Sequence, residues 1–438
     1  MSDQQTENSN AANDLIEQFN QGHVEAVIKK ASELLKQNPN SFLIWNIFGA
    51  ANKSAGNIDG ALKAFKETTS LNPKYADGFN NLGVMLLETG EITKAILAYE
   101  KALSIKPKYP DAFNNLGNAF YKQKNWKEAI DAYHDAIAIK PDYAEAYYNL
   151  GNTLYAQKKW AAAISEYQKA TAIKSRYAEA YVGMGNAHKQ AEEYEEAKAA
   201  FRIAISIRPN DEIAKHMIAA LEGQTNAKAP AKYVEDLFDD YASNFENSLL
   251  HDLDYKTPKV LADILVQQSE SRTLGKVLDL GCGTGLVGDE LRGTCDYLEG
   301  VDLSQSMLDL ARSKNVYDKL SKCEIVEFLA HKTLEFDYFI AADVFVYFGD
   351  LSEVFNLIKS KSKQTAKLIF TTEHFDGPNY SLQKTGRYSH SKRYIELLCN
   401  QFGWQISHFS KANLRKEKQN YIEGALYIVD FFPNKLSG

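Results

Sequence analysis

The chain of 438 residues has little cysteine and no long apolar segment. Its four cysteines, Cys282, Cys295, Cys323 and Cys399, form no C-x-x-C pair and all lie in the second half. We therefore expect reduced thiols rather than a disulfide framework, and no metal site. No apolar run approaches the ~18 residues of a membrane-spanning helix. The polar start, MSDQQTENSNAAND, lacks the apolar core of a secretory signal. We expect a cytoplasmic protein that does not enter a membrane.

The chain also lacks an excess of basic residues. Lys and Arg number 50 against 57 Asp and Glu, which gives a net charge of −7 at pH 7. This balance argues against a general nucleic-acid binder. The apolar content of 45% and the charged content of 24% are ordinary for a globular protein. At this length we expect two or three domains, each with its own core.

The first half of the chain repeats. A glycine recurs every 34 residues, and an alanine and then an aromatic residue follow it in each unit. Glycine and alanine let two antiparallel helices approach closely, the aromatic ring fills the space between them, and proline ends most units. The pattern resembles the tetratricopeptide repeat (TPR), whose helical hairpins stack because one hairpin cannot bury its own apolar face. The glycines are Gly49, Gly83, Gly117, Gly151 and Gly185, the alanines Ala61, Ala95, Ala129, Ala163 and Ala197, and the aromatics Phe65, Tyr99, Tyr133, Tyr167 and Phe201.

The repeats predict an all-α TPR superhelix over residues 8–222. It comprises six repeats, the first degenerate at 8–41, and a closing helix at 212–222. Residues 223–232 are small, polar and proline-bearing, which is typical of a linker. The resemblance implies that a peptide or protein binds in the concave groove.

Asparagines recur along the first helix of successive repeats. An amide offers both a donor and an acceptor, so amides spaced along a groove suit the backbone of an extended peptide. These rows resemble the asparagine ladder in the repeats of O-linked N-acetylglucosamine transferase, which implies peptide contacts. The alternative is that the amides solvate a helix face or bond between repeats. One row holds Asn81, Asn115 and Asn149, and the other holds Asn118, Asn152 and Asn186.

After residue 233 the period stops, and strand-like runs alternate with helix-length segments. This alternation predicts an α/β domain over 233–435, with a mostly parallel, Rossmann-like sheet. The last two runs lie closer together and suit an antiparallel pair at one edge. In such sheets a ligand binds at the carboxyl ends of the strands. The runs are 276–280, 297–302, 336–343, 366–373, 404–409 and 425–432.

The stretch DLGCGTG, residues 279–285, predicts a ligand-binding turn after the first strand. A phosphate-binding P-loop is excluded, because Asp289 and Glu290 follow Gly288 where Lys and Ser or Thr are needed. The glycine spacing allows a dinucleotide, and Asp302 lies near the offset of its ribose-binding acid. However, Asp279 would repel a pyrophosphate at this point. A cationic ligand without phosphate, S-adenosyl-L-methionine (SAM), fits better.

VLDLGCGTG resembles motif I of class I SAM-dependent methyltransferases, and GVDLS (300–304) resembles the motif that follows. The resemblance implies a seven-stranded sheet and a set of SAM-binding residues. Asp279 would hold the methionine ammonium, Asp302 the ribose hydroxyls and Glu324 the adenine amine, with Gly281, Gly283 and Gly285 allowing close backbone approach. The whole chain also resembles bacterial predicted methyltransferases with N-terminal TPR repeats. Their lead-in segment is similar to residues 233–258, which implies a helix that closes over the cofactor with Tyr241 near the methionine.

Candidates for the methyl acceptor side lie after the fourth and fifth strands. No [DN]-P-P-[YF] motif for adenine or glutamine N-methylation is present; Asp343 begins the stretch in its place. Arg387 and Arg415 suit a clamp on a carboxylate, and a histidine suits a general base. The alternatives are structural ion pairs and inert histidines. The catalytic candidates are His374, Tyr347, Asp343 and His390, and the acceptor-binding candidates are Arg387, Tyr388 and Arg415.

Three functions remain open from the sequence. The first is a SAM-dependent methyltransferase whose repeats present a peptide or protein acceptor. The second is a methyltransferase for a small carboxylate-bearing molecule, with the repeats used for assembly. The third is a SAM-binding scaffold without catalysis, against which Asp279, Asp302 and the glycines are all intact.

Overall fold

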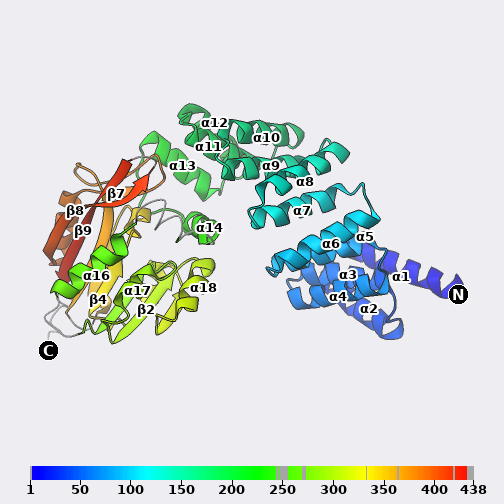
Figure 1. Ribbon diagram of the computed structural model, residues 1–438, viewed down its shortest axis with the longest axis horizontal. Helices are drawn as coiled ribbons and strands as arrows, with labels where there is room; N and C mark the ends of the chain where they lie inside the picture. The colour runs from blue at the N-terminus through cyan, green and yellow to red at the C-terminus, as the bar shows by residue number, and fades with distance from the viewer. Residues whose placement is uncertain are drawn as a thin grey trace. The chain divides into compact units, whose positions relative to one another are not determined.

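The computed structural model describes residues 2–242, 246, 255–268, 273–331, 333–362, 365–417 and 420–431, without the side chains of 2–10, 240, 241 and 417. The chain divides into two compact units, residues 1–209 and 210–438. Each unit is coloured along the chain in Figure 1. Helix α13 (Glu212–Glu222) falls in the second unit, whereas the sequence analysis assigned it to the repeats.

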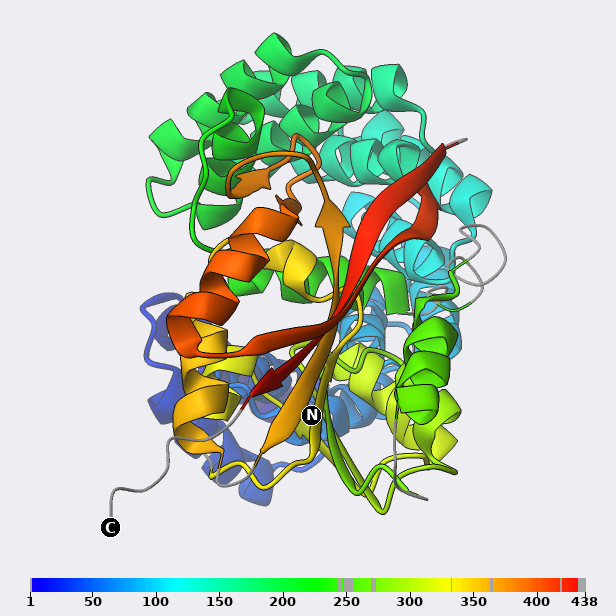
Figure 2. The same cartoon turned by 90° about the vertical axis from the view of Figure 1, so that its left-hand side faces the viewer.

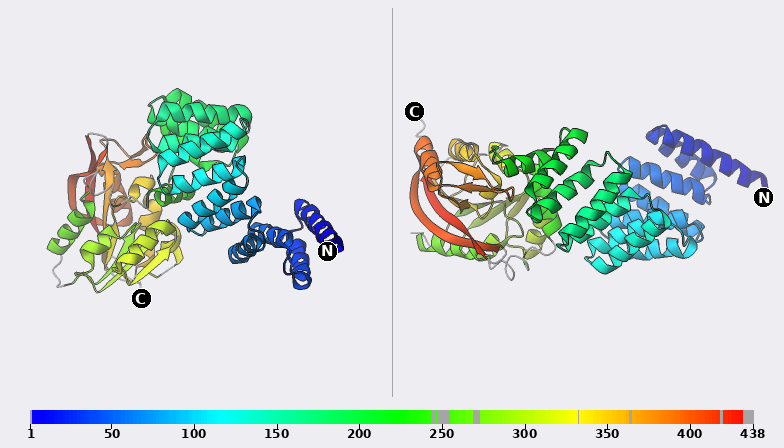
Figure 3. Two further views of the ribbon diagram at one scale, coloured as in Figure 1. Left: turned by 45° about the vertical axis from the view of Figure 1, so that its right-hand side comes forward. Right: turned by 90° about the horizontal axis from the view of Figure 1, so that it is seen from above.

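The first unit is built of helical hairpins, as the 34-residue period predicts. Over residues 2–209, six pairs of helices follow one another, and Figure 3 shows them stacked in chain order. Gly83 faces Tyr99 across one pair: a Cβ atom at Gly83 would lie 2.5 Å from the tyrosine ring. The glycine and the aromatic therefore fill one space. The pairs are α1 (Ser2–Asn20) and α2 (Val24–Gln37), α3 (Phe42–Ser54) and α4 (Ile58–Leu71), α5 (Ala76–Glu88) and α6 (Ile92–Ile105), α7 (Pro110–Lys122) and α8 (Trp126–Ile139), α9 (Ala144–Ala156) and α10 (Trp160–Ile173), and α11 (Ala178–Gln190) and α12 (Tyr194–Ile207).

Helix α13 packs inside the second unit. Its Ala219 and Ala220 form one buried cluster with Leu382 and Tyr388. The imidazole of His216 is buried, with Nε2 2.9 Å from the carbonyl oxygen of Gly386. An amphipathic pattern shows that one face of a helix is buried and does not name the partner of that face, which is why the sequence placed α13 with the preceding repeats.

The second unit contains a nine-stranded sheet in the described part of the chain. Strands β3, β2, β1, β4 and β5 are adjacent and parallel. Strand β9 pairs antiparallel with both β5 and β8, which confirms the predicted antiparallel pair; Figure 2 shows β9 beside β5. The short hairpin β6–β7 adds two strands to the seven expected. The strands are β1 (Lys276–Leu280), β2 (Tyr297–Asp302), β3 (Lys319–Lys322), β4 (Tyr338–Ala341), β5 (Ala366–His374), β6 (Tyr380–Leu382), β7 (Tyr388–His390), β8 (Gln405–Glu417) and β9 (Asn420–Phe431).

Strand β3 is absent from the predicted strands because its sequence, KLSK, holds one apolar residue. The remaining helices of the second unit connect or cover the strands. They are α14 (Ala231–Tyr241), α16 (Thr257–Gln268), α17 (Leu286–Leu291), α18 (Gln305–Lys314), α19 (Ile325–His331), α20 (Ser352–Lys361) and α21 (Lys392–Phe402), with a 3₁₀ turn, η3 (Phe345–Tyr347). Among the described residues, no helix has the length and apolar character to span a membrane.

The two faces of the sheet carry different apolar clusters. Leu278 and Leu280 pack with residues of α19, α20 and α21, whereas Val277 packs with residues of α16 and α17. In β5, Leu368 and Phe370 belong to the first cluster and Ile369 to the second. Because side chains alternate along a strand, the face of every residue at the carboxyl ends of β1 and β5 follows from this assignment.

Candidate active site

The glycine turn joins the end of β1 to the start of α17. Gly281, Gly283 and Gly285 have φ angles of +71°, +52° and +89°, a region that favours glycine. A Cβ atom on Gly281 would lie 2.4 Å from Cγ2 of Val344. The turn therefore depends on glycine, and it brings the backbone close to the loop that follows β4.

Asp279 is a fully buried carboxylate next to this turn. Its Oδ2 atom accepts a hydrogen bond of 2.7 Å from the hydroxyl of Tyr317. Its Oδ1 atom is buried and has no hydrogen-bond partner among the described residues. Burial raises the pKa of Asp279 to about 7. A buried acceptor of this kind suits a cationic ligand that supplies the missing partner.

Asp302 ends β2 and links two loops. Its Oδ2 accepts a hydrogen bond of 2.9 Å from the amide of Gly283, and its Oδ1 accepts one of 2.8 Å from the amide of Ser304. Burial raises the pKa of Asp302. Ser304 caps α18, its hydroxyl accepting from the amide of Met307. The carboxylate thus joins the glycine turn to the start of α18.

Glu324 lies just after β3. Its Oε2 accepts a hydrogen bond of 3.1 Å from the amide of Glu327 at the start of α19, and its Oε1 lies 3.7 Å from Nζ of Lys228. The structure thus places Asp279, Asp302 and Glu324 at the carboxyl ends of three adjacent strands. The side chain of Tyr241 lies outside the described residues.

The acceptor-side arginines are bound to carboxylates. Arg415 lies 2.9 Å from Oδ2 of Asp343 through Nη1 and 2.6 Å from Oε1 of Glu373 through Nη2. Arg387 Nε lies 2.7 Å from the same Glu373 oxygen. The expected substrate clamp is therefore occupied from within, and a substrate carboxylate would have to compete with both acids. Arg415, Asp343 and Glu373 have side chains that are at most 12% exposed.

Asp343 has a φ of +55°, unusual for a residue with a side chain. Its amide donates to the hydroxyl of Thr371 at 2.8 Å, and that hydroxyl donates to Oδ1 of Asp343 at 2.9 Å. Strained backbone held by such bonds is typical of functional sites. The carboxylate is nevertheless fully engaged by Thr371 and Arg415, so it does not stand ready as a general base.

The two predicted histidines lie away from this cluster. Glu373 shares the α16–α17 face with Ile369, whereas His374 is one residue on and faces the other side. His374 is buried, with its Nε2 atom 3.4 Å from Oδ1 of Asp376. His390 pairs with His374 in the sheet register and lies on the same side.

His390 is a core residue. It is fully buried, its Nε2 lies 3.0 Å from the carbonyl of Gly349, and its ring stacks on Tyr394 at 5.7 Å. Burial lowers the pKa of His390 to about 4. Neither imidazole shares a face with Asp279. The prediction for His390 is corrected because it is a core residue, and the prediction for His374 stays a prediction.

The two predicted tyrosines differ. Tyr347 is partly buried in η3, with its ring 5.5 Å from that of Phe238 in α14. Burial raises the pKa of Tyr347, and the charges of Arg387 and Arg415 oppose this rise. Tyr388 is fully buried against the ring of His216 at 6.0 Å, as part of the core.

Tyr317 was not predicted from the sequence, and Glu373, found beside His374 at the end of the predicted fifth strand, was not chosen as a site residue. Tyr317 holds Asp279 from 38 residues away, and no motif marks it. Glu373 joins both arginines; the signal that would have found it is the alternation of β5, which puts Glu373 and Asp279 on one face.

The side chains of both asparagine rows form hydrogen bonds with other residues of the first unit. Asn115 donates through Nδ2 to Oδ1 of Asn80, and Asn149 donates to Asn114, both at 3.0 Å. In the second row, the side-chain oxygens accept from tyrosines: Asn118 from Tyr133 and Asn152 from Tyr167, both at 2.8 Å. Bonds between repeats, the alternative to peptide contacts, are thus observed for the first row, and contact of these amides with a peptide stays a prediction.

Models of known protein families match a range of residues in each of the two units. Models described as TPR repeat and Tetratricopeptide repeat match residues 84–124, 117–158, 151–192 and 178–211, and one described as Methyltransferase domain matches residues 278–368. The chain carries TPR repeats followed by a methyltransferase domain. The matched methyltransferase range contains the glycine turn, Asp279, Asp302, Glu324 and Asp343.

Curated relatives of the methyltransferase are distant. A ubiquinone biosynthesis O-methyltransferase of Coxiella burnetii is 28% identical over 99 residues, 22% of this chain and 42% of the relative. Methyltransferase-like protein 27 of Homo sapiens is 34% identical over 90 residues, 20% of this chain and 36% of the relative. An uncharacterized methyltransferase of Schizosaccharomyces pombe is 28% identical over 150 residues, 30% of this chain and 51% of the relative. The chain thus spans about half or less of each relative.

Solved structures similar to this chain include MamA, 28% identical with a TM-score of 0.34 over 38% of this chain and 92% of MamA. The type IV pilus biogenesis factor PilW is 18% identical with a TM-score of 0.45, over 47% of this chain and 95% of PilW.

Proposed function

We propose that the methyltransferase domain uses SAM and that the TPR repeats present a protein or peptide acceptor to it. The observation that carries the donor half is Asp279, a fully buried carboxylate with one oxygen lacking a donor in the described structure. SAM carries an ammonium and a sulfonium and no phosphate. Its positive charge supplies the partner that the buried carboxylate lacks.

The residues around Asp279 fit this donor. Gly281 leaves no space for a side chain, because a Cβ atom there would meet Val344, so the turn keeps its backbone conformation only with glycine. The carboxylate of Asp302, at the end of β2, suits the hydroxyls of a ribose. A dinucleotide would bring a pyrophosphate near the buried carboxylate of Asp279 and the partly buried carboxylate of Asp302, at a large electrostatic cost. The donor set thus favours SAM over a nicotinamide cofactor.

Methyl transfer from SAM requires the protein mainly to position the two reactants. SAM supplies, when bound, a methyl group already activated for in-line displacement. The chain's own residues then orient the acceptor and exclude water. Glu373 lies on the same face of the sheet as Asp279, and Arg415 fixes it there. Tyr347 carries its hydroxyl proton at neutral pH, as any tyrosine does, and burial raises its pKa further, so it suits hydrogen bonding to an acceptor.

Calorimetry of the full chain with SAM and with S-adenosylhomocysteine tests the donor half. We expect both to bind, and Asp279→Ala to weaken SAM by about 100-fold, since it removes a buried charge partner. Asp289→Asn is the matched control, because Asp289 is an acid of α17 that pairs with Lys314 at 2.6 Å. Absence of SAM binding by the unaltered chain, or NAD binding in its place, would overturn the assignment.

The acceptor half rests on the TPR repeats, which support protein or peptide interaction. The test incubates the full chain with tritiated SAM and a bacterial extract. We expect label in protein, and none with Asp279→Ala. Mass spectrometry then locates the methyl group. Label confined to small molecules would contradict presentation by the repeats, and donor binding without any transfer would leave a SAM-binding scaffold.

A small-molecule acceptor is the second candidate. It is favoured by the likeness to a ubiquinone biosynthesis O-methyltransferase, whose name indicates a small substrate. In that case the repeats would serve assembly with other proteins. The engaged arginines count against a carboxylate as the recognised group, since Glu373 and Asp343 already hold Arg415.

A further inference from the structure

The segment from Ala227 to Asp239 follows the carboxyl edge of the sheet. At its start, the carbonyl of Ala227 accepts from the amides of Gly349 and Asp350, both at 2.8 Å, in the loop after η3. Further on, Glu235 lies 3.0 Å from Nζ of Lys322 at the end of β3. The segment, which includes α14, thus passes the loops that follow β4, β3 and β2.

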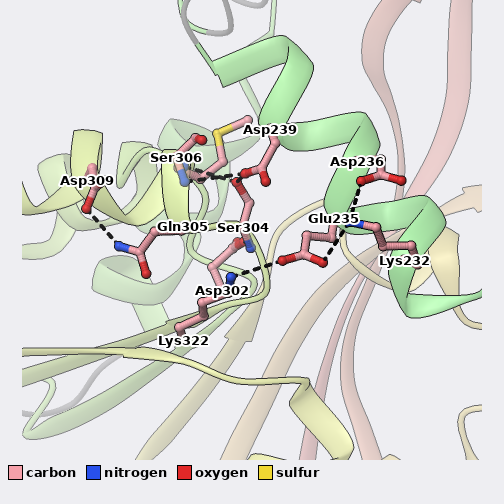
Figure 4. A network of polar contacts seen from close by, with 11 residues as sticks. Lys232, Glu235, Asp236, Asp239, Asp302, Ser304, Gln305, Ser306, Asp309 and Lys322 are labelled. Carbon is pink, nitrogen blue, oxygen red and sulfur yellow. Dashed lines mark hydrogen bonds and ion pairs between the residues drawn. The ribbon is translucent and has the colours of Figure 1, made fainter. Parts of the chain in front are cut away.

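Near its end, α14 contacts the loop after β2 through Asp239. Figure 4 shows Asp239 beside Ser304, whose hydroxyl donates to Oδ1 of Asp239 at 2.5 Å; the amide of Ser306 donates to the same oxygen at 3.4 Å. Ser304 is fully buried, and its amide donates to Asp302, which in turn holds the amide of Gly283. Four residues from three parts of the chain therefore form one hydrogen-bonded series: Asp239, Ser304, Asp302 and Gly283.

We propose that Asp239 is a positioning residue of the donor site, acting through Ser304 to hold Asp302 and the glycine turn in place. This inference rests on the proposed function. By binding the hydroxyl of Ser304, Asp239 fixes the start of α18, and the amide of Ser304 then keeps Asp302 directed toward the turn. The same bond holds α14 against this edge, so the release of the donor slows while Asp239 is bound.

Asp239 is exposed, so its hydrogen bond adds little to the stability of the fold. This exposure separates a positioning role from a merely structural one. Asp236, one turn of the same helix away, pairs with Lys232 at 2.7 Å and is not part of the series. It provides a matched control.

The test compares variants of the full chain by calorimetry and by the dissociation rate of S-adenosylhomocysteine. We expect Asp239→Ala to weaken binding about 10-fold, mainly through faster dissociation, the scale of one lost hydrogen bond. Asp239→Asn should stay within about threefold of the unaltered chain, because its amide oxygen still accepts from Ser304. Asp236→Ala should bind as the unaltered chain does.

Hydrogen exchange without ligand gives an independent readout. The amides of Gly283 and Ser304 should exchange faster in Asp239→Ala and remain unchanged in Asp236→Ala. Unchanged exchange and unchanged affinity in Asp239→Ala would overturn this inference alone. Failure of the unaltered chain to bind either ligand would overturn the proposed function and this inference with it.

Discussion

At the end of β1, Asp279 is a buried carboxylate with an oxygen that no described residue binds, whereas at the ends of β4 and β5 the carboxylates of Asp343 and Glu373 are both bound by Arg415. The two regions lie at the same edge of one sheet. The first leaves an acceptor oxygen without a partner among the described residues, and the second pairs its charges internally. Under the proposed function, the donor side receives a charged partner, whereas the acceptor side uses its charges to hold its own structure.

The largest expected loss of stability comes from removing Arg415, the central cation of the acceptor side. Arg415→Met leaves Asp343 without its counter-ion and Glu373 with Arg387 alone, and we expect it to destabilise the second unit by about 3 kcal/mol. Urea unfolding of the full chain measures the loss. Arg393→Met, at an exposed position of α21, is the control and should change little. An Arg415→Met chain as stable as the original would show that the cluster is not a closed ion network.

Removing a charge on the donor side should stabilise the chain, whereas removing Arg415 on the acceptor side destabilises it. The pKa of Asp279 rises from 3.8 to about 7 on folding, so its charge costs stability progressively as the pH rises through this range. Asp279→Asn should therefore stabilise the unliganded chain at pH 8, by at most about 4 kcal/mol, while weakening SAM binding by up to about 100-fold. Thermal unfolding at pH 8 and calorimetry measure the two effects. Loss of both stability and binding would mean that the unbound oxygen of Asp279 has a protein partner.

His390 sharpens the comparison, since it is buried on the other face of the sheet. Folding lowers its pKa from 6.5 to about 4, so the unfolded chain binds the proton first as the pH falls. Its contribution to stability is thus present above pH 6.5 and is lost toward pH 4, by about 3 kcal/mol. In part of this pH range, Asp279 changes the free energy of unfolding in the opposite direction, because it lowers stability as the pH rises. The pH dependence of unfolding of His390→Gln, compared with the unaltered chain, isolates the histidine; His23→Gln, at an exposed position, should follow the unaltered curve.

The smallest expected effect concerns the repeats, in which Asn115 donates one hydrogen bond to Asn80. Asn115→Ala removes the bond to Asn80 and should destabilise the first unit by about 1 kcal/mol. A double-mutant cycle with Asn80→Ala measures the coupling between the two amides. Unchanged stability with lost capture of a protein partner would instead make this row a binding surface.

Much of the donor site could be predicted from the sequence. The glycine turn, Asp279 and Asp302 lie within 24 residues of one another, and the end of each strand follows from a short apolar run. The acceptor side could not be predicted, because Arg415 is 72 residues from Asp343 and 42 from Glu373 along the chain. His374 was favoured over its neighbour Glu373 for its chemistry, and a one-residue step in a strand reverses the face on which a side chain lies.

The sequence by itself determined the period of the repeats, the glycine turn and the acid that precedes it, because these depend on contacts between residues close in the chain. Only the tertiary structure decided that helix α13 belongs with the sheet, that the arginines are bound by Asp343 and Glu373, and that both histidines lie on the far face. Those outcomes depend on which buried surfaces and charges meet across long stretches of chain, and no local pattern records that pairing.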